Sequence, residues 1–319
     1  MILEGKGTPD IIESIIDDNM IDIINCINYS SDLKLNINKK IKKRSLKCNI
    51  NIIFNSGKNY KGNVNYRECL DSEFRKCIIN VYFPKNYNLS LIIKTLTHEL
   101  THIYELYQIN EKIDITKWKW QEALNDIGDF FNTSHLLYFR DILYLSLPQE
   151  LNARVSSIYF YLKMNSSRGY NKNQVLEILY NSREWQNYKN LMDFDPDQLT
   201  LGISNYYGKN ISISFLIINT LNKKIGIDKR ITNIGELNSY LRRLDKYFKK
   251  SAIKYKNKLM RVVDKVVDEN NKKFEYLTND SINVDYNEYI KEDKLESRNK
   301  KLEVLLEYSE FINFIENNI

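Results

Sequence analysis

The chain has 319 residues, of which 43% are hydrophobic and 28% are charged, and its formal net charge is +6. This composition is ordinary for a soluble globular protein, and the length is sufficient for one large domain or for one domain with a helical extension. Only 10 glycines and 4 prolines occur, which argues against long disordered linkers and against a dense, turn-rich β architecture.

The first residues and the spacing of the cysteines indicate the cellular compartment of the protein. The start, MILEGKGTPD, has no basic segment followed by an apolar run, and no stretch reaches 18 uncharged apolar residues, so neither a secretory signal nor a membrane span is expected. Cys26, Cys48, Cys69 and Cys77 form no C-x-x-C pair and no framework spacing, which favours a reducing compartment. A soluble, cytoplasmic protein is therefore expected.

The first part of the chain predicts one helix and a small sheet. Isoleucine and methionine recur at helical spacing over residues 9–29, which predicts an amphipathic helix. Apolar and polar residues alternate at 33–37 and again at 48–54, as in strands. Residues 55–65 are rich in turn formers, whereas FRKCIINVYF (74–83) is β-branched and aromatic and is the clearest strand.

A basic segment lies within this predicted sheet. Residues 34–47, KLNINKKIKKRSLK, hold seven basic side chains and no acidic one. A hairpin with a lysine-rich solvent face is the expected structure, because such a face also discourages edge-to-edge pairing. Contact with a nucleic acid or another anionic surface is the alternative. It is disfavoured, because no aromatic side chain is interleaved to stack on bases.

After residue 84 the apolar residues recur at helical spacing. Asn88 or Ser90 is able to cap a helix that runs to about Tyr107. The remaining helical patterns lie at 117–131, 135–145, 148–164, 173–192 and 210–222. Each of these segments is predicted to be a helix.

The last part of the chain is dominated by one segment. Over residues 234–277 the apolar side chains follow steps of three and four along a narrow seam, which predicts a single long helix. Residues 278–300 are polar and are expected to be irregular, and a final helix is expected to begin near residue 301. A boundary near 225–233 is predicted to divide an N-terminal body (1–225) from a helical extension (226–319). The predicted fold class is α+β, with a small N-terminal sheet followed by a mostly helical part.

The motif H-E-x-x-H lies in the helix predicted around residues 90–107. The chain has only three histidines, and two of them, His98 and His102, stand four positions apart in LTHELTHIYE. Four residues along an α-helix correspond to about 400° of rotation and about 6 Å of rise, so both imidazoles project from one face and can bind one metal ion. Glu99 lies about 100° round the helix from His98, beside that ion, where a carboxylate can accept a proton from a water molecule that the metal activates.

These residues resemble a known family. The sequence TLTHELTHIY is similar to the active-site helix of the zincin metallopeptidases. The strand FRKCIINVYF before it is similar to the edge strand over the zincin cleft, on which an extended peptide adds as a further strand. The resemblance implies a zinc-dependent peptidase in which His98 and His102 bind one Zn²⁺ ion and Glu99 is the general base. It also implies a third protein ligand from further along the chain.

Glu150 is the favoured third ligand. Pro148 suits the first turn of a helix and places Glu150 at the opening of that helix. Zincins with a glutamate ligand supply it from such a second helix, so the resemblance favours Glu150. The alternative is a purely structural glutamate at a helix N-terminus, paired at i,i+4 with Arg154.

Three other residues compete for the ligand role. His135 is the third histidine of the chain and follows His102 by 33 positions. Glu105 continues the face of His98 at i+7, but it lies about 10 Å along the helix axis, which suits a residue that orients an imidazole. Cys69 precedes the motif, as the cysteine of peptide deformylases does, although the glycine-rich strand motif of those enzymes is not seen. Arg154 is able to stabilise an oxyanion or to bind a carboxylate. Tyr206 and Tyr207 are candidates to point at the cleft, but in a chain with 23 tyrosines they are expected to belong to the aromatic core, and no oxyanion donor is assigned.

A second function is also considered. The chain is rich in Ile, Asn, Lys and Tyr, a bias typical of AT-rich codons, and it has the coiled-coil-like segment 234–277. In both features it resembles uncharacterised bacteriophage or mobile-element proteins with zincin domains. That resemblance implies a structural or cargo component of a particle, with a weak or inactive peptidase, located in the host cytoplasm or the virion. The expected partners are a peptide or protein substrate and an assembly formed through the helical extension. Neither a nucleic acid nor a membrane is expected.

Overall fold

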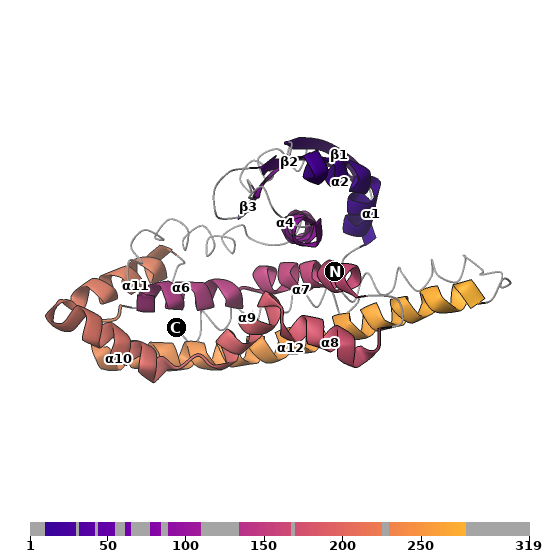
Figure 1. Cartoon of the computed structure of the whole chain (residues 1–319). Coiled ribbons are helices and arrows are strands. Elements are labelled where there is room, and N and C mark those ends of the chain that lie inside the picture. The colour runs from indigo at the N-terminus through magenta and orange to yellow at the C-terminus, as the bar shows by residue number, and fades with distance from the viewer. Residues whose placement is uncertain are drawn as a thin grey trace. The chain divides into compact units, whose positions relative to one another are not determined.

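The fold is α+β, as predicted: a small four-stranded sheet is followed by a mostly helical part (Figure 1). The structure is a computed structural model. It describes residues 10–29, 32–41, 44–54, 61–64, 77–83, 89–109, 134–166, 170–224 and 230–278. The helices expected at 117–131 and from residue 301 lie outside these residues. So does the irregular chain expected at 278–300, apart from Thr278.

The chain divides into two compact units, each built from three separate stretches. Unit 1 consists of residues 1–109, 152–184 and 258–301, and unit 2 consists of residues 110–151, 185–257 and 302–319. Two helices, α7 (Pro148–Asn165) and α12 (Ile234–Thr278), run without a break through the points of division. The boundary predicted near 225–233 falls partly outside the described residues, and it stays a prediction.

Two short helices, α1 (Asp10–Asp18) and α2 (Met20–Tyr29), replace the single helix predicted at the start of the chain. The break is at Asn19. Its side-chain amide donates to the carbonyl oxygen of Ile15 at 2.8 Å, and its backbone N–H donates to Ile16 instead. The Asn19 amide therefore takes the acceptor that a continuous helix would use, a competition typical of asparagine.

The sheet contains four strands in the order β1-β2-β4-β3. Strands β1 (Leu33–Ile41) and β2 (Arg44–Phe54) form the predicted antiparallel hairpin, in which Ile41 pairs with Arg44. Strand β4 (Cys77–Phe83) pairs parallel with β2, and β3 (Lys61–Val64) pairs antiparallel with β4. The register places alternate side chains on opposite faces of the sheet.

One face of the sheet belongs to the core, and the other faces solvent. Helix α4 (Leu89–Ile109) packs against β3 and β4. It presents a row of side chains that are at most 2% exposed, namely Ile92, Ile93, Leu96, Leu100 and Ile103. On the hairpin, Lys34 and Lys47 are exposed, in agreement with the predicted lysine-rich solvent face.

The expectation that the strand at 74–83 is an edge strand is wrong. Residues 61–64, which the sequence suggested to be part of a turn, form β3 and cover the side of β4 that β2 leaves open. Strand β3 is only four residues long and contains Gly62, so it lacks the β-branched and aromatic run by which strands are recognised in a sequence. The edge of the sheet beside α4 is therefore β3.

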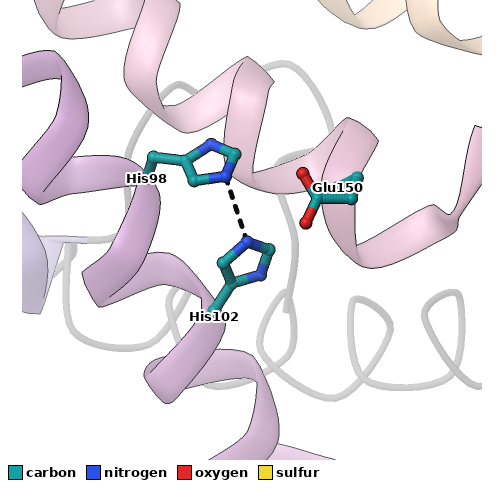
Figure 2. A group of neighbouring side chains, drawn as sticks. All are labelled: His98, His102 and Glu150. Carbon is teal, nitrogen blue, oxygen red and sulfur yellow. Dashed lines mark hydrogen bonds between the residues drawn. The ribbon is translucent and has the colours of Figure 1, made fainter. Parts of the chain in front are cut away.

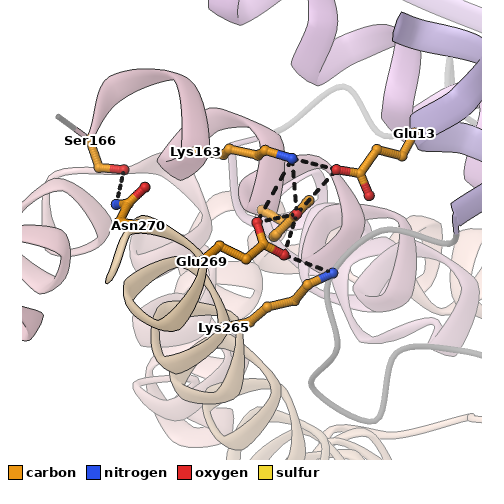
Figure 3. A network of polar contacts seen from close by, with 7 residues as sticks. Glu13, Lys163, Ser166, Lys265, Glu269 and Asn270 are labelled. Atoms are coloured by element: carbon orange, nitrogen blue, oxygen red, sulfur yellow. Dashed lines mark hydrogen bonds and ion pairs between the residues drawn. The ribbon is translucent and has the colours of Figure 1, made fainter. Parts of the chain in front are cut away.

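A polar network ties three helices of unit 1 together (Figure 3). The hydroxyl group of Tyr159, on α7, lies 2.8 Å from a carboxylate oxygen of Glu269 on α12 and 3.3 Å from Glu13 on α1. Lys163 pairs with Glu13, and Lys265 pairs with Glu269. Burial raises the pKa of Tyr159, and the charges of Glu13 and Glu269 raise it further, so the phenol stays protonated.

The remaining helices agree with the predictions from the sequence, with two differences. Helices α6 (Ser134–Ser146) and α11 (Ser212–Lys224) lie close to their predicted positions. The helix predicted at 173–192 is two helices, α8 (Lys172–Tyr180) and α9 (Arg183–Met192), because the N–H groups of Asn181 and Ser182 bond back to residues of α8.

Helix α10 (Pro196–Tyr207) was not predicted, although its start carries a recognisable signal. Asp195 accepts hydrogen bonds from the N–H groups of Asp197 and Gln198, and Pro196 occupies the first turn. Gly208, at a φ of 49°, ends the helix. Long helix α12 has the predicted seam of buried apolar side chains. No helix in the described part of the chain has both the length and the apolar character needed to cross a bilayer.

Candidate metal centre

Helix α4 carries the H-E-x-x-H motif. An ion pair that starts one turn before His98 anchors this helix. The ammonium group of Lys94 lies 2.7 Å from a carboxylate oxygen of Glu184, whose side chain is only 2% exposed. The same ammonium group lies 4.9 Å from the centre of the Tyr161 ring on α7. A buried pair of this kind needs good geometry, because the cost of removing both charges from water is large. The pair therefore fixes α4 against the elements that follow it.

The two histidines direct one nitrogen each at the same point (Figure 2). The Nε2 atoms of His98 and His102 are 3.1 Å apart, and the two ring planes are almost perpendicular. His102 is 1% exposed, whereas His98 is partly exposed. In the absence of a cation, one imidazole donates to the other; with a cation between them, both nitrogens can turn a lone pair towards it.

Glu150 faces the same point from the first turn of α7 (Figure 2). Its side chain is fully buried. Each of the three residues offers one ligand atom, and these atoms lie within 4.8 Å of one another. The structure thus brings the favoured third residue to the two histidines across 48 positions of sequence.

The donor set fits a divalent metal ion. Two nitrogens bound to one tetrahedral zinc ion at about 2.0–2.1 Å lie about 3.3 Å apart, and the observed separation is 3.1 Å. Two imidazoles and one carboxylate are also the ligand types of a catalytic zinc site, which keeps a fourth position open. The group formed by His98, His102 and Glu150 could therefore hold a metal ion.

Glu99 lies beside this group and is not part of it. Its side chain is 8% exposed, and it follows His98 directly on α4, which turns it about 100° away from the face of the two histidines. Among the described residues, the atoms that converge are those of His98, His102 and Glu150. Glu99 is therefore a buried neighbour of His98 in the chain, and the structure does not include it among the converging ligands.

His135 has a packing role in unit 2. Its ring lies against Gly202 of α10, so closely that a Cβ atom on Gly202 would be 2.5–2.9 Å from three ring atoms. Contacts this short do not occur, so a side chain at residue 202 would require the His135 ring to shift. His135 does not belong to the converging group in the described part of the chain.

Of the other candidates, those that the structure describes are not brought into the group. Glu105 is fully buried on α4, but it is not among the three residues whose ligand atoms converge. Cys69 lies outside the described residues. Tyr206 is 62% exposed and packs edge-on against Tyr207 at 5.1 Å, so Tyr206 is not part of the aromatic core as expected.

Sequence reasoning missed the ion pair of Lys94 and Glu184. For Lys94, the sequence does contain a signal. Lys94 is the only basic residue of α4, and it precedes His98 by four positions, on the same helical stripe. Glu184 is 90 positions away, and nothing in the sequence links it to Lys94.

Comparison of the chain with protein-family models, with curated proteins and with solved structures finds no match.

Proposed function

We propose that this chain is a zinc-dependent peptidase that uses Glu99 as the general base. One observation carries the proposal: two imidazoles and a buried carboxylate converge beside a glutamate that does not join them. A purely structural site would need a fourth protein ligand, whereas three ligands leave room for water or substrate. The resemblance of TLTHELTHIY to the zincin active-site helix supports the same conclusion.

Each residue has a distinct task in this proposal. His98, His102 and Glu150 would hold the ion. Zinc bound there supplies Lewis acidity, which polarises a carbonyl group and makes water more acidic. Glu99 takes the proton of the attacking water and returns it to the amine that leaves when the peptide bond breaks. The neighbouring pair of Lys94 and Glu184 keeps α4 in place and touches no substrate.

The edge of the sheet supports a peptide as substrate. Strand β3 packs beside α4 and pairs with β4 on one side. No strand among the described residues pairs with its other side. An extended peptide can add to such an edge through backbone hydrogen bonds, which positions a scissile bond without recognising a particular sequence.

The decisive experiment is Glu99→Gln. We expect this variant to bind one equivalent of zinc, as the wild type does, and to lose at least about 100-fold of its rate on an unfolded protein substrate, since general-base catalysis contributes about 10²–10⁴-fold. The two measurements are the zinc content and the rate of peptide-bond cleavage.

Glu177→Gln is the matched control, because it makes the same chemical change at an exposed position on α8. It should retain both zinc and activity. Cleavage by Glu99→Gln at the wild-type rate would overturn the general-base role. A wild-type chain that binds zinc but cleaves no unfolded protein would overturn the peptidase itself.

A further inference from the structure

A trough of about 960 Å³ lies beside α11 in unit 2. Its lining comes from α11 and from residues 230–232, which precede α12. Four of the ten lining residues are apolar, four are polar and uncharged, and two, Lys223 and Arg230, are basic. None of these described residues is acidic, and none belongs to the candidate metal centre. The volume falls within the range of about 300–1,000 Å³ that is usual for binding sites.

One wall of the trough is fixed by a side-chain clamp. The amide group of Asn219 on α11 donates to the carbonyl oxygen of Ile231 at 2.8 Å, and the amide oxygen accepts from the N–H group of Ile231 at 2.7 Å. The two bonds satisfy both backbone groups of Ile231, whose side chain is only 1% exposed. Residues 230–232 are therefore held beside α11 without a ligand, which lowers the cost of ordering the site when a ligand binds.

The other wall is one stripe of α11 that changes from apolar to basic. Its residues follow one another at steps of three, four and three and therefore share a face of the helix: Ile213, Leu216, Thr220 and Lys223. Ile213 is 47% exposed and Leu216 is 66% exposed, whereas Phe215 is buried. Large apolar side chains thus stand open at one end of the stripe, and a basic side chain stands at the other.

Both basic side chains belong to the same end of the trough. Lys223 follows Asn219 by one helical turn, and Arg230 directly precedes Ile231, which Asn219 holds. Both basic residues are exposed. Neither forms an ion pair with another residue in the described part of the chain. Two cations beside an apolar surface indicate a ligand that is both apolar and anionic.

The acidic residue that follows in the chain is engaged elsewhere. The carboxylate of Glu236 accepts hydrogen bonds from the N–H group of Thr232 at 2.7 Å and from the hydroxyl group of Thr232 at 3.0 Å. These bonds lower the pKa of Glu236. Glu236 is not one of the lining residues, so the trough keeps its positive charge.

We propose that this trough binds a peptide segment in which a large apolar side chain precedes a carboxylate by about three residues. Leu216 and Lys223 are seven residues apart on α11, which is about 10 Å, and three residues of an extended peptide also span about 10 Å. The apolar side chain packs on Ile213 and Leu216, and the carboxylate pairs with Lys223 and Arg230. A chain terminus and an acidic side chain can both supply this carboxylate.

Other anionic ligands fit the lining less well. A single-stranded nucleic acid needs exposed rings on which its bases stack, and Phe215, the aromatic residue of the lining, is buried. A fatty acid would cover the hydroxyl groups of Ser212 and Thr220 without offering them a hydrogen bond, which is costly. A peptide offers apolar side chains together with backbone groups that bond to these hydroxyl groups.

The test is fluorescence anisotropy of the full chain with pentapeptides that carry tetramethylrhodamine at the N-terminus. We expect Leu-Phe-Ser-Ser-Gly with a free C-terminal carboxylate to bind with a Kd at or below about 1 mM. Its C-terminal amide should bind at least about 5-fold more weakly, since the charge-assisted bonds are lost. Ser-Ser-Leu-Phe-Gly, with the same composition and a free carboxylate, should also bind at least about 5-fold more weakly, because its spacing is wrong. The amide of Leu-Phe-Ser-Ser-Glu distinguishes the two sources: recovered affinity indicates an acidic side chain, and unrecovered affinity indicates a chain terminus.

Two variants test the two ends of the trough. Lys223→Glu with Arg230→Glu should weaken binding of the free-acid peptide at least about 10-fold and leave binding of the amide unchanged. Leu216→Ser should weaken binding of both peptides about 5-fold, because it removes the apolar contact. All three side chains are exposed, so the substitutions should leave the fold intact.

Each variant has a matched control outside the lining. Lys189→Glu with Lys246→Glu makes the same change in net charge at two exposed positions, and Leu201→Ser makes the same apolar-to-polar change at a side chain that is 61% exposed. Both controls should bind the free-acid peptide as the wild type does. Anisotropy reads binding alone, so the result is separate from the outcome of the cleavage assay.

Three results would overturn the proposal. The first is a wild-type chain that binds the free-acid peptide no better than its amide. The second is a charge reversal at Lys223 and Arg230 that leaves peptide binding unaltered. The third is a reversal that abolishes binding to vesicles of phosphatidylglycerol and phosphatidylcholine in a chain that binds no peptide, which would indicate an anionic lipid surface as the partner.

Discussion

Burial of the Glu150 side chain, which the sequence does not show, strengthens its candidacy as a ligand. A glutamate in the first turn of a helix is common, because it interacts favourably with the helix dipole. What distinguishes Glu150 is complete burial next to two imidazoles. A buried carboxylate is costly unless a cation or several hydrogen bonds compensate it, and an ion held by the three converging residues would be such a cation.

Substitution of Glu150 tests this explanation. Glu150→Ala should weaken zinc binding by more than about 100-fold, since even residues that only orient a ligand are worth about 10–100-fold. His135→Ala should leave the affinity unchanged, because the His135 ring packs on Gly202. Competition with a chromogenic chelator measures both affinities. The opposite pattern, with the loss at His135, would move the third ligand to that residue.

The His135 ring occupies the space that a Cβ atom on residue 202 would need, and this gives a second prediction. In an ordinary helix, Gly→Ala stabilises by about 1 kcal/mol. Gly202→Ala should instead destabilise by about 1–2 kcal/mol, because overpacking a filled site costs about 1–3 kcal/mol. In a His135→Ala background the sign should reverse, and Gly202→Ala should stabilise. Urea unfolding of the four variants measures this cycle; equal effects in the two backgrounds would show that the ring moves aside without cost.

At the scale of elements, the network around Tyr159 joins α1, α7 and α12 within unit 1. Burial lowers the pKa of Lys163, but the hydrogen bond and charge of Glu13, together with the charges of Glu269 and Asp17, outweigh it, so the pKa is raised overall. The pKa of Tyr159 is also raised. Both shifts stabilise the protonated groups in the folded state.

The sign of the resulting pH dependence follows from linkage. A lysine with a raised pKa contributes stability that is complete below its unfolded pKa of about 10.4 and is lost as the pH rises through the folded value. Unfolded tyrosine ionises near pH 10, which favours unfolding in the same range. The difference in unfolding free energy between the wild type and Lys163→Met should therefore be constant from pH 7 to about 9 and should shrink above about pH 10.

Denaturant titrations across this pH range measure the effect. Lys172→Met is the matched control, because Lys172 also pairs with a carboxylate of α12, Asp264, but both side chains are about half exposed. Its contribution should be small at every pH. A Lys163 contribution that grows with rising pH would contradict the network as described.

The elements that could be predicted from the sequence are those whose residues determine them locally. Strand β4 and helix α4 follow from a β-branched run and from apolar spacing, and the H-E-x-x-H motif follows from the helical period. The break at Asn19 depends on a side-chain hydrogen bond, and β3 depends on pairing with β4. Neither leaves a periodic pattern. The start of α10, which was not predicted, does carry a local signal, a capping Asp195 followed by Pro196 in the first turn.

The candidate site shows the same limit. The pairing of His98 with His102 follows from four positions on one helix, but the meeting with Glu150 spans 48 positions, and only the resemblance to zincins suggested it. The pair of Lys94 and Glu184 had no comparable guide. Long-range contacts are set by how whole elements pack, and the sequence of one element does not contain that information.

At the scale of the whole molecule, metal binding should be coupled to stability. An ion that binds only the folded chain stabilises it by about 2.7 kcal/mol at a free concentration 100 times the Kd. Zinc should thus raise the midpoint of thermal unfolding by about 3–6 °C, and a chelator should reverse the shift. His98→Ala should unfold at the same temperature with and without zinc. A zinc-dependent shift in that variant would place the ion elsewhere in the chain.

The alternation of the two compact units along the chain constrains the order in which they can be completed during synthesis. The sheet and α4 leave the ribosome early, but their unit also needs the second half of α12, up to Thr278. Between Ile109 and Thr278 lie 278 minus 109, or 169 residues, which take about 10–30 s to translate. During that interval unit 1 lacks residues 152–184 and 258–301, which complete it, so newly made chains should depend on chaperones far more than denatured full-length chains that refold.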